Sequence, residues 1–203
     1  MANQKPKYKG SKYTTPIGRA SYPAIFEPKL KFQTKTGEKE YTIDVLFKKG
    51  EDLSQFNKSV NTALEEVFGA DKKKWPTNIS YPLKLQDELI EKAQDKGQAH
   101  DHYEKGAYYA KFKTNAKNGA PVIVDHPDCN AIIDPTEIYG GCFVRVSGQI
   151  KVNVIPGTKT VYCTPYLGGV QKVKDGDSFG GGKFDAESAF EPVTFDADEN
   201  LTD

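Results

Sequence analysis

The clearest pattern in the chain is a strict alternation of apolar and polar residues over residues 142–154, CFVRVSGQIKVNV. One set of alternate positions is apolar or small, while the other carries Phe143, Arg145 and Lys151 and no acid. A period of two is that of a β-strand with one face in a core and the other outside. Gly148 interrupts the run and indicates a bulge or a sharp bend. The pattern therefore predicts a long, bent strand with an aromatic and basic outer face.

A second stretch, residues 108–114 (YYAKFKT), repeats this pattern. Its alternation turns Tyr109, Lys111 and Lys113 to one side, again without an acid. Aromatic rings stack nucleobases and cations neutralise phosphates, so faces of this kind are typical of single-stranded nucleic-acid binding. On these two patterns alone, ordinary exposed strand faces with one aromatic residue each remain an equal alternative.

The N-terminal half contains a pair of strands. Residues 17–32 are rich in β-formers but hold two prolines, which is typical of an interrupted or edge strand. Lys29 and Lys31 alternate with apolar residues near its end and are expected to point outward. Residues 41–47 (YTIDVLF) alternate strictly, and the two runs together predict a hairpin.

The period changes over residues 51–68, where apolar residues recur three and four positions apart. This spacing predicts an amphipathic helix, with Asp52 as its N-cap and Gly69 at its end. Residues 83–96 include a second helical stretch, which is short and charged. Trp75, between the two, is either a stacking platform or a core residue. The core is favoured because large aromatic side chains are usually well buried.

The later part of the chain adds strands around the two already described. Residues 121–124 form a short apolar run, and residues 161–170 form a further strand that we expect Pro165 to break. The total is about five or six strands with one substantial helix, and no parallel β-α-β rhythm occurs. The chain is therefore predicted to be mainly β: a five-stranded OB-fold antiparallel barrel with a helical insert between strands.

Charge divides the chain into three parts. Lys and Arg number 28 and so do Asp and Glu, but residues 185–203 hold seven acids and no Lys or Arg. Residues 1–184 consequently carry a net charge of +7, and residues 1–13 combine four lysines with Gly, Pro, Asn and Gln. We expect a basic flexible arm over 1–13, an OB-fold single-stranded DNA-binding domain over 14–184, and a disordered acidic C-terminal tail over 185–203.

Cysteine usage and hydropathy indicate the compartment. Two of the three cysteines, Cys142 and Cys163, lie in apolar strand-like runs and are expected to be buried thiols in a reducing compartment. The sequence has no apolar run of about 18 residues and no N-terminal secretory signal. We therefore expect a soluble, intracellular protein that does not insert into a membrane.

Signatures of catalysis are missing from the sequence. It contains no Walker loop, no GxGxxG and no GxSxG, so we predict no catalytic residue and no cofactor. His126 and Cys129, taken with His100 and His102, match no standard zinc spacing. Ordinary loop histidines and a buried thiol are therefore favoured over a metal site.

Three carboxylates offer an enzymatic alternative. Asp125, Asp128 and Asp134 could hold a magnesium ion in a metal-dependent nuclease. They alternate with Pro and His in a turn-rich stretch, so turn-forming acids are the favoured interpretation.

The outward aromatic and basic residues together predict a sequence-tolerant face for single-stranded DNA. Stacking of a base on an aromatic ring contributes about 1–3 kcal/mol and tolerates any base. The acidic tail can occupy the basic groove when no DNA is bound, or recruit basic partner surfaces, and a plain solubility segment is the alternative. The candidate binding residues are Lys29, Lys31, Tyr109, Lys111, Lys113, Phe143, Arg145 and Lys151.

The blocks GRASYPAIFEP, YTIDVLF, YYAKFKT, PVIVD, IYGGCFVRVSGQIKV and VQKVKDGDSFGG occur in this order. Over about residues 17–184 the chain thereby resembles phage-encoded single-stranded DNA-binding proteins of OB fold. The resemblance implies a non-enzymatic protein that coats single-stranded DNA, cooperatively or as a homodimer, in phage DNA replication, recombination and repair. It also implies action in the cytoplasm of the infected bacterial host and contacts of the tail with a phage polymerase or helicase. A structural protein of the phage particle is the remaining alternative.

Overall fold

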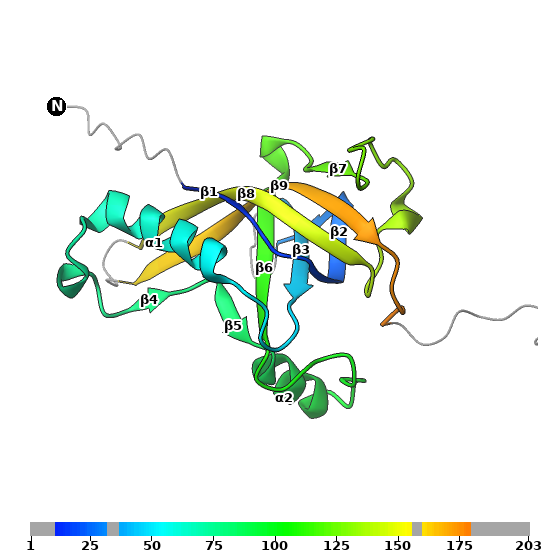
Figure 1. Ribbon diagram of the computed structural model, residues 1–203, viewed down its shortest axis with the longest axis horizontal. Coiled ribbons are helices and arrows are strands. Elements are labelled where there is room, and N and C mark those ends of the chain that lie inside the picture. Colours follow the sequence, from blue (N-terminus) through cyan, green and yellow to red (C-terminus); the bar gives the residue numbers. More distant parts are fainter. Residues whose placement is uncertain (1–10, 32–36, 156–159, 180–203) are drawn as a thin grey trace, which may run out of the picture.

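The computed structural model describes residues 11–31, 37–155 and 160–179, and the prediction of a mainly β protein is confirmed (Figure 1). The α-helices of these residues are α1 (Ser54–Phe68) and α2 (Asp87–Asp95), with 3₁₀ turns at Lys72–Lys74 (η1), Ala116–Asn118 (η2) and Pro135–Glu137 (η3). The strands are β1 (Ser11–Thr14), β2 (Gly18–Leu30), β3 (Lys39–Leu46), β4 (Ile79–Ser80), β5 (Leu83–Leu85), β6 (Tyr108–Asn115), β7 (Val122–Val124), β8 (Phe143–Val154) and β9 (Val161–Lys174).

Five long strands pair in a closed circuit. β2 pairs with β3, β3 with β6, β9 with β8, and β8 returns to β2, all antiparallel. β6 and β9 complete the circuit through a parallel pairing of Lys113 with Tyr166, an addition to the antiparallel barrel that the sequence predicts. The short strands lie outside the circuit: β1 on β8, β4 and β7 on β9, and β5 on β6. The helical insert is confirmed, because α1 and α2 lie between β3 and β6.

The long alternating strand is confirmed as β8, which begins one residue after Cys142. Its ladder to β9 shifts register between Ser147 and Gly148, so the prediction of an irregularity at the glycine is confirmed. A side chain at Gly148 would place its Cβ 1.8 Å from the carbonyl oxygen of Tyr166. Glycine is therefore required here by the close approach of the two backbones.

Replacing Gly148 with alanine is expected to lower the free energy of unfolding by about 1–3 kcal/mol, the usual cost of forcing atoms into filled space. Urea unfolding measures this change. Gly140→Ala is the matched control, because its Cβ would meet only Phe179, at 3.7 Å, and it should unfold like the wild type. An unfolding midpoint for Gly148→Ala equal to that of the control would contradict the close approach.

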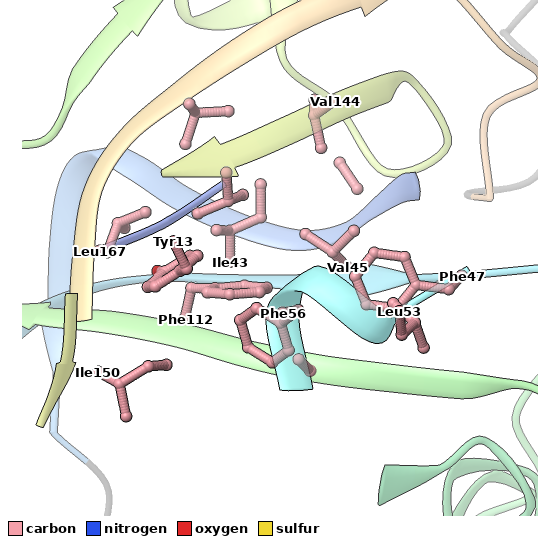
Figure 2. Packing of buried hydrophobic residues seen from close by; sticks show 14 of the residues in the cluster. Tyr13, Ile43, Val45, Phe47, Leu53, Phe56, Phe112, Val144, Ile150 and Leu167 are labelled. Atoms are coloured by element: carbon pink, nitrogen blue, oxygen red, sulfur yellow. The ribbon is translucent and has the colours of Figure 1, made fainter. Parts of the chain in front are cut away.

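The core is built around three aromatic rings, from β1, α1 and β6 (Figure 2). Ring centroids lie 5.2 Å apart for Tyr13 and Phe56 and 5.7 Å apart for Tyr13 and Phe112. Phe56 belongs to the predicted apolar stripe of α1, whose Val60 and Leu64 are also buried. The helix thus packs its apolar face against the sheet, as its sequence period predicts.

Two local predictions about the helical insert can be compared with the structure. α1 begins at Ser54 with Leu53 as its N-cap residue, so the prediction of Asp52 as N-cap is wrong by one position. The Asp52 carboxylate nevertheless accepts a hydrogen bond from the Ser54 N–H at 2.9 Å. Trp75 is half-buried, packs against the core and donates from Nε1 to the Gly69 carbonyl at 2.8 Å, in agreement with the core interpretation.

The predicted basic arm is shorter than residues 1–13. Residues 11–13 belong to β1, which pairs with β8. The Tyr13 ring is only 4% exposed, and its hydroxyl donates to the Tyr166 carbonyl at 2.9 Å. Residues 1–10 and the predicted acidic tail lie outside the described residues. Within the described ranges, no helix is long and apolar enough to cross a membrane.

Candidate nucleic-acid interface

The outer faces of β8 and β9 place polar and aromatic residues in matched rows. Asn153 lies opposite Tyr162, and Lys151 lies opposite Thr164. The intervening residues of both strands, such as Ile150 and Cys163, point into the core. Tyr162 is 43% exposed, so this face presents an accessible aromatic ring beside an amide and an ammonium group.

A third row crosses four strands and is centred on Tyr166. Gln149 of β8 lies opposite Tyr166, with Lys12 of β1 beyond it, and Lys113 of β6 pairs with Tyr166 from the other side. Side chains directly opposed on one face of a sheet have Cβ atoms about 4.5–5.5 Å apart. The half-buried ring of Tyr166 is therefore flanked by an amide and an ammonium group.

Two further groups fix the Tyr166 ring. The Lys151 Nζ lies 3.5 Å from the ring centroid, close enough for a cation–π contact. Asn118, at the end of η2, donates from its side-chain amide to the tyrosine hydroxyl. These contacts hold the ring in one orientation, which lowers the entropy that stacking would cost.

A groove runs along this face past β6. One part, of about 380 Å³, is lined by Lys31, Lys113 and Lys151 together with Tyr166. It shares Lys113 and Thr164 with a second part of about 430 Å³ that reaches α2. We call the two parts the lysine groove, because six lysines line it against two acids: Lys31, Lys84, Lys92, Lys111, Lys113 and Lys151, with Glu40 and Asp44.

The lysines differ in how firmly they are paired. Lys111 Nζ lies 3.2 Å from Asp44 Oδ1, and the Asp44 carboxylate is nearly buried. Burial raises the pKa of Asp44, while Lys111 and Lys29 oppose the shift. Lys113 and Lys151 have no carboxylate partner among the described residues. These two ammonium groups are therefore free to neutralise phosphates.

Five of the eight predicted binding residues line the lysine groove, namely Lys31, Tyr109, Lys111, Lys113 and Lys151. Lys29 is exposed on β2 and interacts electrostatically with Asp44 beside the groove. The structure thus brings the predicted lysines of three separate strands to one surface.

The predicted stacking role of Tyr109 is not supported by its surroundings. The ring points outward from β6 and lines the groove near Leu89 of α2, but it is only 6% exposed. Burial raises its pKa to about 12. A ring covered in this way offers no open face to a base, and the prediction is corrected for this residue.

Phe143 and Arg145 are not part of the groove. They lie eight and six residues from Lys151 along β8, and neither is among the residues that line the groove. The shared groove predicted for these three side chains is therefore wrong.

Phe143 and Arg145 each line a hollow other than the lysine groove. Phe143 lines a separate hollow of about 610 Å³, where the Lys174 Nζ lies 4.6 Å from its ring centroid and the Arg19 guanidinium 5.4 Å from it. Arg145 donates from Nε to the Thr15 carbonyl at 3.2 Å and borders an apolar hollow beside Val122. Both side chains thus lie at the end of β8 remote from Tyr166.

The carboxylates and histidines considered for a metal site do not form a cluster of ligands in the described part of the chain. Asp125 accepts a hydrogen bond from the Asn130 N–H at 2.7 Å, and Asp134 accepts one from the Thr136 N–H at 2.8 Å, as turn-forming acids do. No group of three or more His, Cys, Asp or Glu side chains within residues 11–31, 37–155 and 160–179 could hold a metal ion. Cys129 is exposed, so the expectation that it is a buried thiol is wrong, whereas Cys142 and Cys163 are buried as predicted.

Sequence reasoning missed the aromatic residues of the site. Tyr162 and Tyr166 alternate with Val161, Cys163 and Leu167, which is the same period-two signal that identified β8. Pro165 was expected to break this strand, and no role was assigned to either tyrosine. β9 instead runs unbroken from Val161 to Lys174.

Comparisons with known proteins agree on one group. A family model described as "Enterobacter phage Enc34, ssDNA-binding protein" matches residues 12–202. A search of curated proteins found no match.

Solved structures of phage single-stranded DNA-binding proteins share the fold. gp2.5 of bacteriophage T7 is 19% identical, with a TM-score of 0.58 over 93% of this chain and 99% of that chain. The protein of bacteriophage Enc34 is 20% identical, with a TM-score of 0.55 over 93% of this chain and 97% of its own. Its complex with single-stranded DNA gives a TM-score of 0.57 at 20% identity, over 87% of this chain and 97% of that chain.

Proposed function

We propose that the chain, which belongs to the family of the Enterobacter phage Enc34 single-stranded DNA-binding protein, binds single-stranded DNA in the lysine groove. The observation that carries this proposal is the row in which Tyr166 stands between Gln149 and Lys113, with Lys151 against its ring. Tyr162 adds a second exposed ring on the same strand face. The family is one of DNA-binding proteins, so the chain is a binding protein and not an enzyme.

The contacts available in the groove and on the adjoining face of β9 suit binding that tolerates any sequence. Tyr162 and Tyr166 each offer a ring on which a base can stack, and every base has a π-face. Lys113 and Lys151 supply cations for the phosphates that connect successive bases. Lys111 is paired with the nearly buried Asp44, so it contributes less positive charge to the bound DNA than Lys113 and Lys151 do.

We further propose that the closed circuit of β2, β3, β6, β9 and β8 is a five-stranded OB barrel. OB folds bind oligonucleotides on the face of their second and third strands and on the adjoining loops. In this chain those strands correspond to β3 and β6, which contribute Glu40, Asp44, Lys111 and Lys113 to the groove. The position of the groove is thus the one that the OB fold favours.

The proposed binding is tested by titrating the protein with a labelled oligo-dT and with a duplex of equal length at several salt concentrations. We expect tighter binding of oligo-dT, because stacking on Tyr162 and Tyr166 requires unpaired bases. If Lys12, Lys113 and Lys151 each neutralise one phosphate, the slope of log K against log salt is about −2. Equal affinity for duplex, or affinity independent of salt, would refute the proposal.

The biological role that we propose is to coat and protect single-stranded DNA during phage DNA replication, recombination and repair in the infected host's cytoplasm. Family membership supports this role over that of a nuclease or a structural protein of the particle. A homodimer that engages one strand with two grooves fits the same role, since linked sites raise the apparent affinity.

We propose that the acidic segment 185–203 competes with DNA for the groove or recruits replication proteins such as a polymerase or helicase. Its seven acids against a body of net charge +7 support this proposal. Deleting residues 185–203 is expected to tighten oligo-dT binding severalfold at low salt, and less at high salt, where charges are screened. If the deletion left the affinity for oligo-dT unchanged at low salt, the proposed competition between the segment and DNA would be contradicted.

A further inference from the structure

Another hollow of the described surface adjoins the lysine groove but is chemically different from it. It has a volume of about 820 Å³ and shares Thr114, Asn118, Lys151 and Tyr166 with the groove. None of its lining residues is Asp or Glu. Its polar side chains are mostly uncharged amides and hydroxyls: Thr14, Gln55, Ser59, Thr114, Asn118, Ser147 and Gln149.

The hollow lies at the register shift between β8 and β9. Gly148 and Gly168 both line it, and a Cβ on Gly168 would lie 3.3 Å from the Gly148 Cα. Tyr13 and Leu167 are nearly fully buried and form its base, next to each other at one end of the core (Figure 2). A volume of this size is within the range of small-molecule sites and can hold one nucleotide unit.

Several polar groups at the rim are available to a ligand. The side-chain amides of Gln55 and Gln149 make no hydrogen bond to another of the described residues, and both line the hollow. Lys12 pairs in register with Gln149 and has no carboxylate partner in the described part of the chain. The Tyr166 ring forms a wall between hollow and groove.

We propose that this hollow is a nucleobase pocket, which takes one base out of the line of stacked bases in the bound strand. The base lies against Tyr166, its edge meets the amides of Gln55 and Gln149, and Lys12 neutralises the adjoining phosphate. The inference rests on the proposed binding of single-stranded DNA and adds to it a preference among bases at one position.

The lining indicates which bases the pocket prefers. Lys12 and Lys151 can only donate hydrogen bonds, and none of the lining side chains is a carboxylate. Thymine has a carbonyl oxygen at the ring position where cytosine has an amino group. An edge held beside ammonium groups that can only donate is therefore better matched by thymine than by cytosine.

The test compares oligo-dT with oligo-dC of equal length, which are both pyrimidine polymers, by competition for the wild-type protein and for Gln55→Leu/Gln149→Leu. We expect the wild type to prefer oligo-dT by about fivefold or more, as a good amide–base contact discriminates. The double variant should lose this preference, and because Gln149 also belongs to the row centred on Tyr166, the measured quantity is the ratio of the two affinities and not either affinity alone. Gln98→Leu, at an exposed position outside the hollow, is the matched control and should keep the preference.

The outcomes separate the pocket from the proposed function. A wild type that binds neither polymer refutes single-stranded DNA binding itself. A wild type that binds both, with the same ratio before and after the double substitution, refutes the pocket alone. Thermal melting checks the fold, and Gln55→Leu by itself, at an exposed position of α1, gives the same comparison if the double variant melts early.

Discussion

Replacing Lys113 and Lys151 with glutamate is expected to weaken oligo-dT binding by about a hundredfold or more at low salt. The two ammonium groups flank the Tyr166 ring and have no carboxylate partner among the described residues. A hydrogen bond to a charged group contributes about 1.5–3 kcal/mol, so losing two costs about 3 kcal/mol or more, which is about a hundredfold in affinity. Fluorescence anisotropy with a labelled oligo-dT measures the change.

The matched control for this variant is Lys96→Glu/Lys105→Glu, which alters the net charge equally. Both control lysines are exposed and line neither the groove nor the nucleobase pocket. We expect the control to weaken binding only slightly, through long-range repulsion that salt screens. If the two double variants lost affinity equally, the binding would depend on net charge and not on the groove.

Replacing Tyr166 with alanine is expected to cost about 2 kcal/mol of binding free energy, or about thirtyfold in affinity, because a stacking platform is lost. The hydrogen bond that the Tyr13 hydroxyl donates to the main-chain carbonyl of Tyr166 does not depend on the Tyr166 side chain, so the fold should persist. Tyr166→Phe keeps the ring and loses only the contact with Asn118, and it should bind nearly as well as the wild type. The same anisotropy titration measures all three proteins.

Phe143→Ala distinguishes the groove from the site that the sequence pattern suggested. The ring of Phe143 lies in the separate hollow with Arg19 and Lys174, so its removal should leave oligo-dT affinity within about twofold of the wild type. If Phe143→Ala lost as much affinity for oligo-dT as Tyr166→Ala, the bound DNA would have to contact both ends of β8. Melting curves of both variants show whether either change acts through stability.

Local sequence patterns predicted the elements well because each depends on near neighbours. The alternation in residues 142–154 identified β8 almost to its ends, and the spacing in residues 51–68 identified α1. The lysines of the groove were found for the same reason, since alternation decides which face of a strand a side chain occupies. Their assembly on one surface required only that β6 and β8 belong to one sheet.

What the sequence could not predict depends on contacts between distant segments. Tyr109 has an outward position on β6, but its ring is only 6% exposed. Phe143 alternates correctly with Lys151, yet the two line different hollows. No local pattern reports which outward side chain distant segments will cover, or which hollow that side chain will line.

Tyr166 is a different case, because its local signal was present. Proline lacks the N–H that a central strand uses, so Pro165 was taken to end the strand. In the structure Pro165 pairs with Ile150 of β8, and the described pairing of β9 with β6 is confined to Lys113 and Tyr166. A proline is tolerated at this position because the edge of β9 toward β6 makes so few ladder contacts.

The most direct test of the binding site is photocrosslinking to single-stranded DNA that carries 5-bromodeoxyuridine, followed by mass spectrometry of the peptides. The site that we propose predicts cross-links on Tyr162 and Tyr166, which lie in β9 and present rings on the groove face. It predicts none on Phe143, in the hollow at the other end of β8. Cross-links confined to the peptide that contains Phe143, with β9 unmodified, would contradict the lysine groove as the site of DNA binding.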